Sequence, residues 1–170
     1  DKAIEHLKFQ SDAIKFTRES ISNSKSLIGF VGGPWTLIRY AFGKDNYYNN
    51  NYKEIYFDFL SSTLVPLLKQ NINLQLEAGA EIVMIFDSSL YDLENLDFKE
   101  NYISILDDIS SNFPNKVGYY SRGKQEADLI HCMQYPFAGF GFDSSINLKY
   151  IFKNSKNGFI QGNFDEKFML

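Results

Sequence analysis

Residues 27–31 read Leu-Ile-Gly-Phe-Val, and Gly32, Gly33 and Pro34 follow directly. A short, uninterrupted apolar run that ends at glycine and proline is typical of a buried strand followed by a turn. Parallel sheets consist of such strands, because helices cover both of their faces. This stretch therefore predicts one strand of a parallel sheet, with a glycine-rich turn at its carboxyl end.

The same unit recurs along the chain. Helical spacing of apolar residues precedes the stretch, over about residues 1–21, and follows it over residues 52–77, where Gly79 is suited to the end of a helix. Further strands are predicted at residues 81–86, 117–120, 139–142 and 159–161. Helices are predicted between them, near residues 98–110, 125–133 and 146–152.

Strands that alternate with helices predict the α/β class and a parallel sheet. An open doubly wound sheet and a closed (β/α)8 barrel use the same unit, and the pattern by itself does not separate them. A complete barrel needs about 250 residues, whereas this chain has 170. The pattern therefore allows either an open sheet or about five consecutive βα units of a barrel.

Charge and cysteine content argue against several classes of function. The formal net charge is -4 and basic residues are not clustered, so we expect no nucleic acid partner. No apolar run reaches the roughly 20 residues of a membrane span, and residues 1–5 do not resemble a secretory leader. We therefore expect a cytoplasmic protein without a membrane partner. Cys132 is the only cysteine, so we expect no internal disulfide and a small buried side chain there.

A metal site is not expected either. The two histidines are His6 and His131, in different predicted helices. The side chains of His131 and Cys132, as neighbours on a helix, would point about 100° apart, which is poor geometry for binding one ion.

Polar residues follow every predicted strand. The carboxyl ends of parallel strands meet at one rim, where α/β proteins place their sites. Helix capping or turn formation explains any one of these residues equally well, but their concentration at one rim favours a binding site. Gly32 and Gly33 would also allow an anionic group to approach the backbone, although no nucleotide-binding motif is present.

Four motifs resemble those of uroporphyrinogen decarboxylases. Residues 29–40, Gly-Phe-Val-Gly-Gly-Pro-Trp-Thr-Leu-Ile-Arg-Tyr, are similar to a family segment with Gly-Phe, small residues, Pro-aromatic-Thr and then Tyr. Glu77-Ala78-Gly79-Ala80 with Ile85-Phe86-Asp87-Ser88 resembles the family's Ala-Gly-Ala helix end and Phe-Asp/Glu-Ser strand end. Residues 141–143 and 161–165 are similar to its Gly-Leu-Asp and Gln-Gly-Asn-Leu-Asp. The motifs occur in family order over nearly the whole chain.

The resemblance implies a (β/α)8 barrel, of which residues 1–170 form the central part of a single domain, with both ends missing. It also implies a carboxy-lyase that removes four acetate carboxylates from uroporphyrinogen III and forms coproporphyrinogen III in haem biosynthesis. No cofactor is implied, because the protonated pyrrole accepts the electrons while a nearby carboxylate of the enzyme stabilises the cationic ring. The family further implies a homodimer when the protein is full-length.

The resemblance assigns roles to particular residues. Phe30 and Gly32 would line the substrate cleft, and Tyr40 and Ser88 would hydrogen-bond to the substrate and its carboxylates, with Tyr40 as the catalytic residue. Further candidate rim residues follow the other strands, and they are Asp87, Arg122, Asp143 and Asn163.

Departures from the family limit what is carried over. The family's key aspartate, its carboxylate-binding arginines and its late histidine belong to segments that this chain lacks, so we expect the 170 residues alone to be inactive. Ser89 stands where the bacterial pattern usually has Trp, and Gly43-Lys44-Asp45-Asn46 replaces a longer loop. Two alternatives stay open. One is a corrinoid- or thiol-linked methyltransferase of the same superfamily, whose zinc motif here reads Tyr120-Ser121-Arg122-Gly123. The other is a non-catalytic tetrapyrrole-binding relative.

Overall fold

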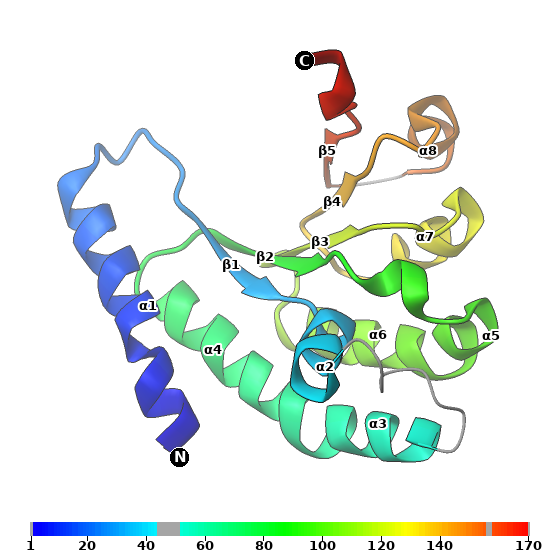
Figure 1. Cartoon of the computed structure of the whole chain (residues 1–170). Coiled ribbons are helices and arrows are strands. Elements are labelled where there is room, and N and C mark those ends of the chain that lie inside the picture. The colour runs from blue at the N-terminus through cyan, green and yellow to red at the C-terminus, as the bar shows by residue number, and fades with distance from the viewer. Residues whose placement is uncertain (1, 44–51, 156–157, 170) are drawn as a thin grey trace.

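The computed structural model describes residues 2–43, 52–155 and 158–169 (Figure 1). Residues 44–46 of the expected shortened loop lie outside the described residues. Five parallel strands form one sheet in the order β1-β2-β3-β4-β5. The strands are β1 (Ile28–Gly32), β2 (Ile82–Asp87), β3 (Val117–Ser121), β4 (Gly139–Phe142) and β5 (Phe159–Gly162).

The strand order separates the two predicted architectures. Each strand pairs with the next strand along the chain, without the reversal of order at which doubly wound sheets bind their ligands. Sequential order is the arrangement of a (β/α)8 barrel. The prediction of an α/β fold with about five units of a barrel is therefore confirmed.

Helices precede and connect the strands, and Figure 1 shows them gathered along one side of the sheet. They are α1 (Lys2–Ser20), α2 (Pro34–Phe42), α3 (Lys53–Phe59), α4 (Val65–Glu77), α5 (Asn95–Asp97), α6 (Ile103–Asn112), α7 (Glu126–Cys132) and α8 (Leu148–Asn154). One π-helical segment, Leu60–Leu64, joins α3 to α4, and another, Phe98–Tyr102, joins α5 to α6. Short 3-10 helices lie at Leu90–Asp92 and Glu166–Met169. None of the described helices has the length and apolar character needed to cross a bilayer.

One helix differs from the sequence analysis, which placed Pro34 in a turn and predicted no helix directly after it. The structure begins α2 at Pro34 itself, directly after β1. Proline suits the first position of a helix, because the amide that it lacks has no intrahelical partner there. Trp35 and Ile38 are buried, so the helix packs into the core rather than forming a loose turn.

Successive side chains of each strand point to opposite faces of the sheet. Val31, Ile85 and Tyr119 point toward the helices and are buried. Phe30 and Phe86 point the other way and are 68% and 41% exposed. In a closed barrel this second face lines the interior, and we call it the inner face.

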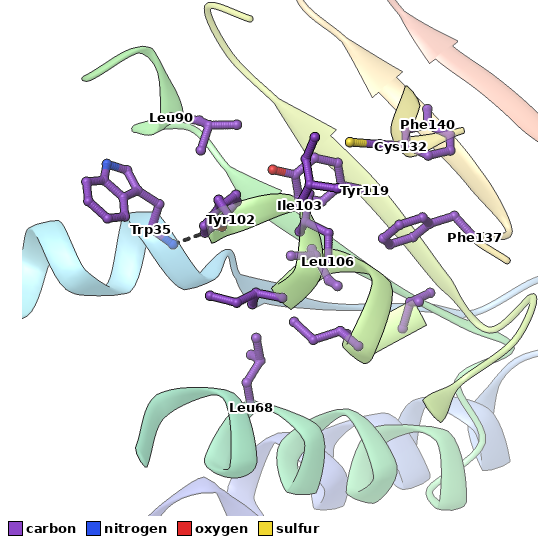
Figure 2. Packing of buried hydrophobic residues seen from close by; sticks show 14 of the residues in the cluster. Trp35, Leu68, Leu90, Tyr102, Ile103, Leu106, Tyr119, Cys132, Phe137 and Phe140 are labelled. Atoms are coloured by element: carbon purple, nitrogen blue, oxygen red, sulfur yellow. Dashed lines mark hydrogen bonds between the residues drawn. The ribbon is translucent and has the colours of Figure 1, made fainter. Parts of the chain in front are cut away.

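The core lies between the sheet and the helices. Figure 2 shows Trp35 beside Tyr102, and Tyr119 near Phe137 and Phe140. The Tyr119 ring centroid lies 5.7 Å from that of Phe137, and aromatic pairs at such distances stabilise beyond their buried area.

Cys132 belongs to the same core. Its side chain is fully buried, and burial raises the pKa of the thiol to about 12. The expectation of a small buried side chain at this position is confirmed.

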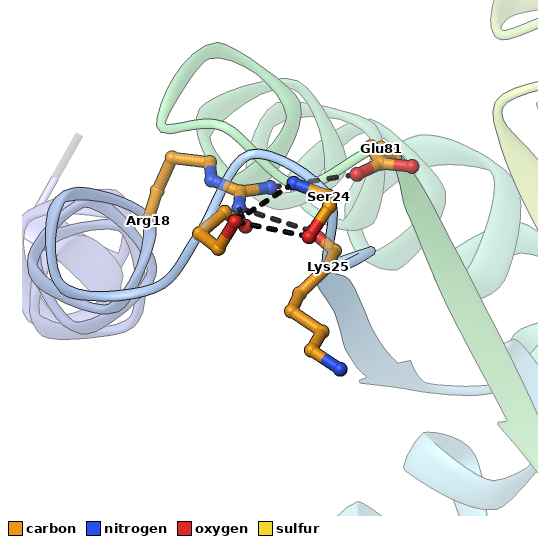
Figure 3. Close-up of polar contacts among 5 residues, drawn as sticks. Arg18, Ser24, Lys25 and Glu81 are labelled. Atoms are coloured by element: carbon orange, nitrogen blue, oxygen red, sulfur yellow. Dashed lines mark hydrogen bonds and ion pairs between the residues drawn. The ribbon is translucent and has the colours of Figure 1, made fainter.

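Arg18 joins the end of α1 to the start of β2 (Figure 3). Its Nη2 donates hydrogen bonds of 2.9 and 3.0 Å to the carbonyl oxygens of Ser22 and Lys25, and its Nη1 lies 3.4 Å from Glu81. The side chain passes close to Gly79, where an added Cβ would lie 2.9 Å from the Arg18 Cγ. Gly79 has φ = 110°, a conformation that residues with a side chain rarely adopt.

We expect Gly79→Ala to lower the free energy of unfolding by about 1–3 kcal/mol, because it adds backbone strain and displaces Arg18. Gly43→Ala is the matched control, since Gly43 has φ = 78° but no described atom lies within 4 Å of an added Cβ. Urea denaturation of both variants measures the difference. Equal losses at the two positions would show that the contact with Arg18 contributes nothing.

Candidate functional site

Two cavities lie at the carboxyl ends of the strands, where the sequence predicted a site. The smaller cavity, of about 360 Å³, lies between α2 and the segments that follow β2 and β3. The larger cavity, of about 710 Å³, lies beside the segments that follow β3, β4 and β5. Tyr91 and Arg122 line both cavities. We call the two cavities together the mouth.

The smaller cavity brings together three residues that the sequence analysis selected. Tyr40 comes from α2, Ser88 directly follows β2, and Arg122 directly follows β3. The Tyr40 side chain is 80% exposed, so its hydroxyl is accessible to a ligand. A phenol and a serine hydroxyl both donate hydrogen bonds without adding charge.

Arg39 and Tyr91 also line this cavity, and the sequence analysis did not select them. Arg39 pairs with Asp92, and its guanidinium carbon lies 5.3 Å from the centre of the Tyr91 ring. Arg39 lies within the quoted motif, but its partners come from the turn after β2. No spacing in the sequence indicates that contact. Arg39 and Arg122 therefore provide two guanidinium groups in the cavity that Tyr40 and Ser88 line.

Arg122, Asp143 and Asn163 line the larger cavity, as expected of rim residues. Asp143 also connects two loops, because its Oδ2 accepts a hydrogen bond of 2.9 Å from the Gly123 amide while its Oδ1 accepts one of 2.8 Å from Ser145. Asn163 has φ = 64° and its side-chain Nδ2 donates a hydrogen bond to the Ile146 carbonyl. Both residues therefore have a structural role in turns as well as a place at the mouth.

The environment of Asp143 favours its charged form. Partial burial opposes ionisation, but hydrogen bonds from the Ser145 hydroxyl and from the Gly123 and Ser145 amides, with the charge of Arg122 nearby, lower the pKa of Asp143.

Asp87 corrects the sequence analysis, which placed it among the rim residues. It ends β2, but its side chain points toward the helices and is fully buried. Phe86 takes the opposite face and Ser88 reaches the cavity. The alternation of side chains along a strand is the physical reason.

The glycine-rich turn offers less to an anionic ligand than expected. The Gly33 amide donates a hydrogen bond of 2.8 Å to the Phe86 carbonyl. The amides of Trp35 and Thr36, in the first turn of α2, donate to the Tyr102 hydroxyl and to Asp87 at 3.1 and 2.9 Å. The hydrogen-bond acceptor at this helix start is therefore the Asp87 side chain of the chain itself.

Phe30 and Gly32 line a different cavity from Tyr40. They border an apolar groove of about 280 Å³ beside α1 and α4. Phe30 is connected to the mouth through aromatic rings on the inner face. Its ring centroid lies 6.4 Å from that of Phe86, which lies 5.7 Å from that of Tyr120, a residue of the larger cavity.

Within the described ranges, no group of three or more His, Cys, Asp or Glu side chains is arranged to hold a metal ion. His131 is exposed and its Nε2 lies 3.4 Å from the Tyr135 hydroxyl.

Acid is expected to weaken the connection that Asp143 makes. Because the pKa of Asp143 is lowered in the folded state, its contribution to stability is present above the ordinary aspartate pKa of about 4 and is lost as the pH falls through the lowered value. Asp143→Asn should therefore flatten the pH dependence of the unfolding temperature in this acidic range. Asp12→Asn, at an exposed position on α1, is the control. Identical curves for wild type and Asp143→Asn would contradict the assignment.

Comparisons with known proteins agree with the motifs. The sequence profile of the family described as "Uroporphyrinogen decarboxylase (URO-D)" matches residues 1–170. Uroporphyrinogen decarboxylase of Campylobacter fetus subsp. fetus (strain 82-40) is 34% identical over 178 residues, which cover 97% of this chain and 51% of that protein. Uroporphyrinogen decarboxylase of Orientia tsutsugamushi (strain Ikeda) is 29% identical over 175 residues, which cover 94% of this chain and 50% of that protein.

A solved structure, a methyltransferase from Methanosarcina mazei, is similar in fold, with a TM-score of 0.65 at 17% identity over 89% of this chain and 47% of that one. The chain spans about half the length of the curated relatives it matches. From the match over its full length and the identity to curated relatives, we conclude that this chain belongs to the uroporphyrinogen decarboxylase family.

Proposed function

We propose that the protein converts uroporphyrinogen III to coproporphyrinogen III by removing four acetate carboxylates, without a cofactor, and that the mouth binds carboxylates of the substrate. One observation carries the proposal. The hydroxyl-bearing residues Tyr40 and Ser88 line the same cavity as the guanidinium groups of Arg39 and Arg122. Family membership supports a tetrapyrrole that carries acetate carboxylates as the substrate.

The two kinds of donor suit different parts of this task. A guanidinium group attracts a carboxylate over a distance and pairs with it through two parallel hydrogen bonds. A neutral hydroxyl donates a hydrogen bond but holds the carboxylate less tightly, so carbon dioxide can leave. We therefore assign Arg122 to binding, and Tyr40 and Ser88 to hydrogen bonds at the reacting arm.

Phe30, Gly32 and Tyr120 would provide the apolar side of the pocket. Phe30 and Tyr120 lie on the inner face, in one series of rings with Phe86. Flat rings of a tetrapyrrole pack favourably on such aromatic side chains. Asp143 and Asn163 would border the far side of the pocket.

The reaction also needs a carboxylate that stabilises the protonated, cationic pyrrole. Asp87 is buried. Asp92 pairs with Arg39, and Asp143 accepts hydrogen bonds from loop amides. We propose that this carboxylate lies outside residues 1–170, so that these residues alone do not decarboxylate the substrate. We further propose that the full-length protein is a homodimer, as the family resemblance implies, and that it is cytoplasmic and binds no nucleic acid, as charge and composition predict.

The methyltransferase alternative receives less support. Its fold is similar, but the likeness at 17% identity concerns the fold alone. The segment Tyr120-Ser121-Arg122-Gly123 offers no histidine or cysteine as a zinc ligand.

Tyr40→Phe in the product of the complete gene should lower kcat/KM for uroporphyrinogen on the order of ten- to a hundred-fold, because a hydrogen bond to a charged group contributes about 1.5–3 kcal/mol. The unfolding temperature should not change, since the side chain is largely exposed. Tyr150→Phe is the control, because Tyr150 is another exposed tyrosine, on α8. Coproporphyrinogen formation, followed by chromatography, gives the rates, and unchanged turnover would remove Tyr40 from the site.

Arg122→Gln should raise KM several-fold with little effect on kcat, because the lost attraction acts on the bound substrate and the transition state alike. The effect should shrink as salt screens the charges. Lys149→Gln, an exposed cation on α8, controls for net charge. A fall in kcat at unchanged KM would contradict a binding role.

A further inference from the structure

Asp87 is a buried carboxylate that the proposed reaction does not use. It receives hydrogen bonds from the Thr36 amide and hydroxyl and from the hydroxyl groups of Tyr102 and Tyr119. We propose that Asp87 is a positioning residue, whose carboxylate holds α2 against the segment after β2 and so sets Tyr40 and Ser88 in their places at the mouth. This inference rests on the proposed function of those two residues.

The first connection runs from Asp87 to α2. Its Oδ1 accepts hydrogen bonds of 2.9 Å from both the amide and the hydroxyl of Thr36. Thr36 is the third residue of α2, where backbone amides have no partner within the helix. Gly33, the residue before the helix, has no side chain to cap it. A carboxylate from the neighbouring strand therefore takes the place of the helix cap, where negative charge is favourable.

Thr36 and Tyr40 are four residues apart on α2, so they lie on the same side of the helix, one turn apart. A displacement of the first turn of this nine-residue helix would therefore also move the Tyr40 side chain.

The second connection runs from Thr36 to the segment after β2. The Thr36 hydroxyl donates to Asp87 and accepts a hydrogen bond of 3.1 Å from the Ser89 amide. Ser88 lies between Asp87 and Ser89, so the same bridge holds its backbone on both sides. One threonine hydroxyl consequently links the two elements that carry Tyr40 and Ser88.

The other carboxylate oxygen fixes Asp87 itself. Its Oδ2 accepts hydrogen bonds from the hydroxyl groups of Tyr102 and, at 3.1 Å, Tyr119. The Tyr102 hydroxyl in turn accepts a hydrogen bond of 3.1 Å from the Trp35 amide. Tyr119 belongs to β3, so the arrangement joins two neighbouring strands, β2 and β3, to the helix that follows β1.

The space around the carboxylate is filled as well. A Cβ added to Gly33 would lie 2.5 Å from the Asp87 Cγ, so the turn after β1 lies directly against this group. Burial raises the pKa of Asp87, whereas the hydrogen bonds from Tyr102, Thr36 and Tyr119 oppose that rise. A buried carboxyl is costly unless its oxygens are satisfied, and here both oxygens have two donors. Such a group specifies the positions of its donors more narrowly than apolar packing would.

Two variants test the inference without emptying the core, in the product of the complete gene. Thr36→Val keeps the shape of the side chain but removes the hydroxyl bridge, and Thr36→Ser keeps that hydroxyl. Asp97→Asn is the matched control, because Asp97 is also a buried carboxyl group but is paired with Lys53 of α3.

The first readout is amide hydrogen exchange, which does not depend on the reaction. Thr36→Val should accelerate exchange at Ser89 on the order of ten-fold, with little change in α6, whereas Thr36→Ser and Asp97→Asn should leave Ser89 near wild type. Unchanged exchange at Ser89 in Thr36→Val, or equal acceleration throughout the chain, would overturn the inference.

The second readout is a double-mutant cycle with Tyr40→Phe. Thr36→Val alone should lower kcat/KM roughly ten-fold, because small displacements of a positioned group are costly. When Tyr40→Phe is already present, Thr36→Val should lower kcat/KM by clearly less than about ten-fold further, because only the effect through Ser88 remains. Independent, multiplicative losses would show that the bridge does not position Tyr40, and would overturn the inference. A wild type that does not decarboxylate uroporphyrinogen refutes the proposed function instead, and hydrogen exchange then decides whether the bridge holds the two elements.

Discussion

The mouth of this protein depends on one buried carboxylate. Asp87 accepts hydrogen bonds from α2, from the segment that leads into α6, and from β3. Because a buried carboxyl must be satisfied by donors at short range, these elements have little freedom to move relative to one another. The exposed residues of the smaller cavity are thus carried by elements that Asp87 holds together. A site needs such fixed positions if it is to hold a ligand in one orientation.

Side chains alternate along each strand, so the two faces of the sheet have different roles. Ile85 and Asp87 face the helices, where one packs and the other receives hydrogen bonds. Phe86 faces the other way and extends the aromatic rings of the inner face. Ser88, just past the strand, reaches the cavity. Four consecutive residues at the end of β2 therefore have four different roles. Ile85 packs in the core, Phe86 lies on the inner face, Asp87 holds α2 in position, and Ser88 lines the smaller cavity.

The inner face is open in this chain. Phe30 is largely exposed there, although a closed barrel would bury such a side chain among the other strands. The family match covers the whole chain, while the chain covers about half of the curated relatives. The described cavities therefore represent one side of the pocket that we propose, which is the side built from hydroxyl and guanidinium groups.

The sequence alone determined the α/β class, the positions of the strands and the family, because apolar runs, helical spacing and motifs such as residues 29–40 are local along the chain. It also placed Tyr40, Ser88 and Arg122 at one rim, because carboxyl ends of parallel strands must meet there. Only the tertiary structure decided that Asp87 is buried and that Arg39 and Tyr91 line the cavity. The burial of Asp87 depends on which face of the sheet its side chain takes, and the positions of Arg39 and Tyr91 depend on contacts between residues that are far apart in the sequence. The local spacing of residues indicates neither of these.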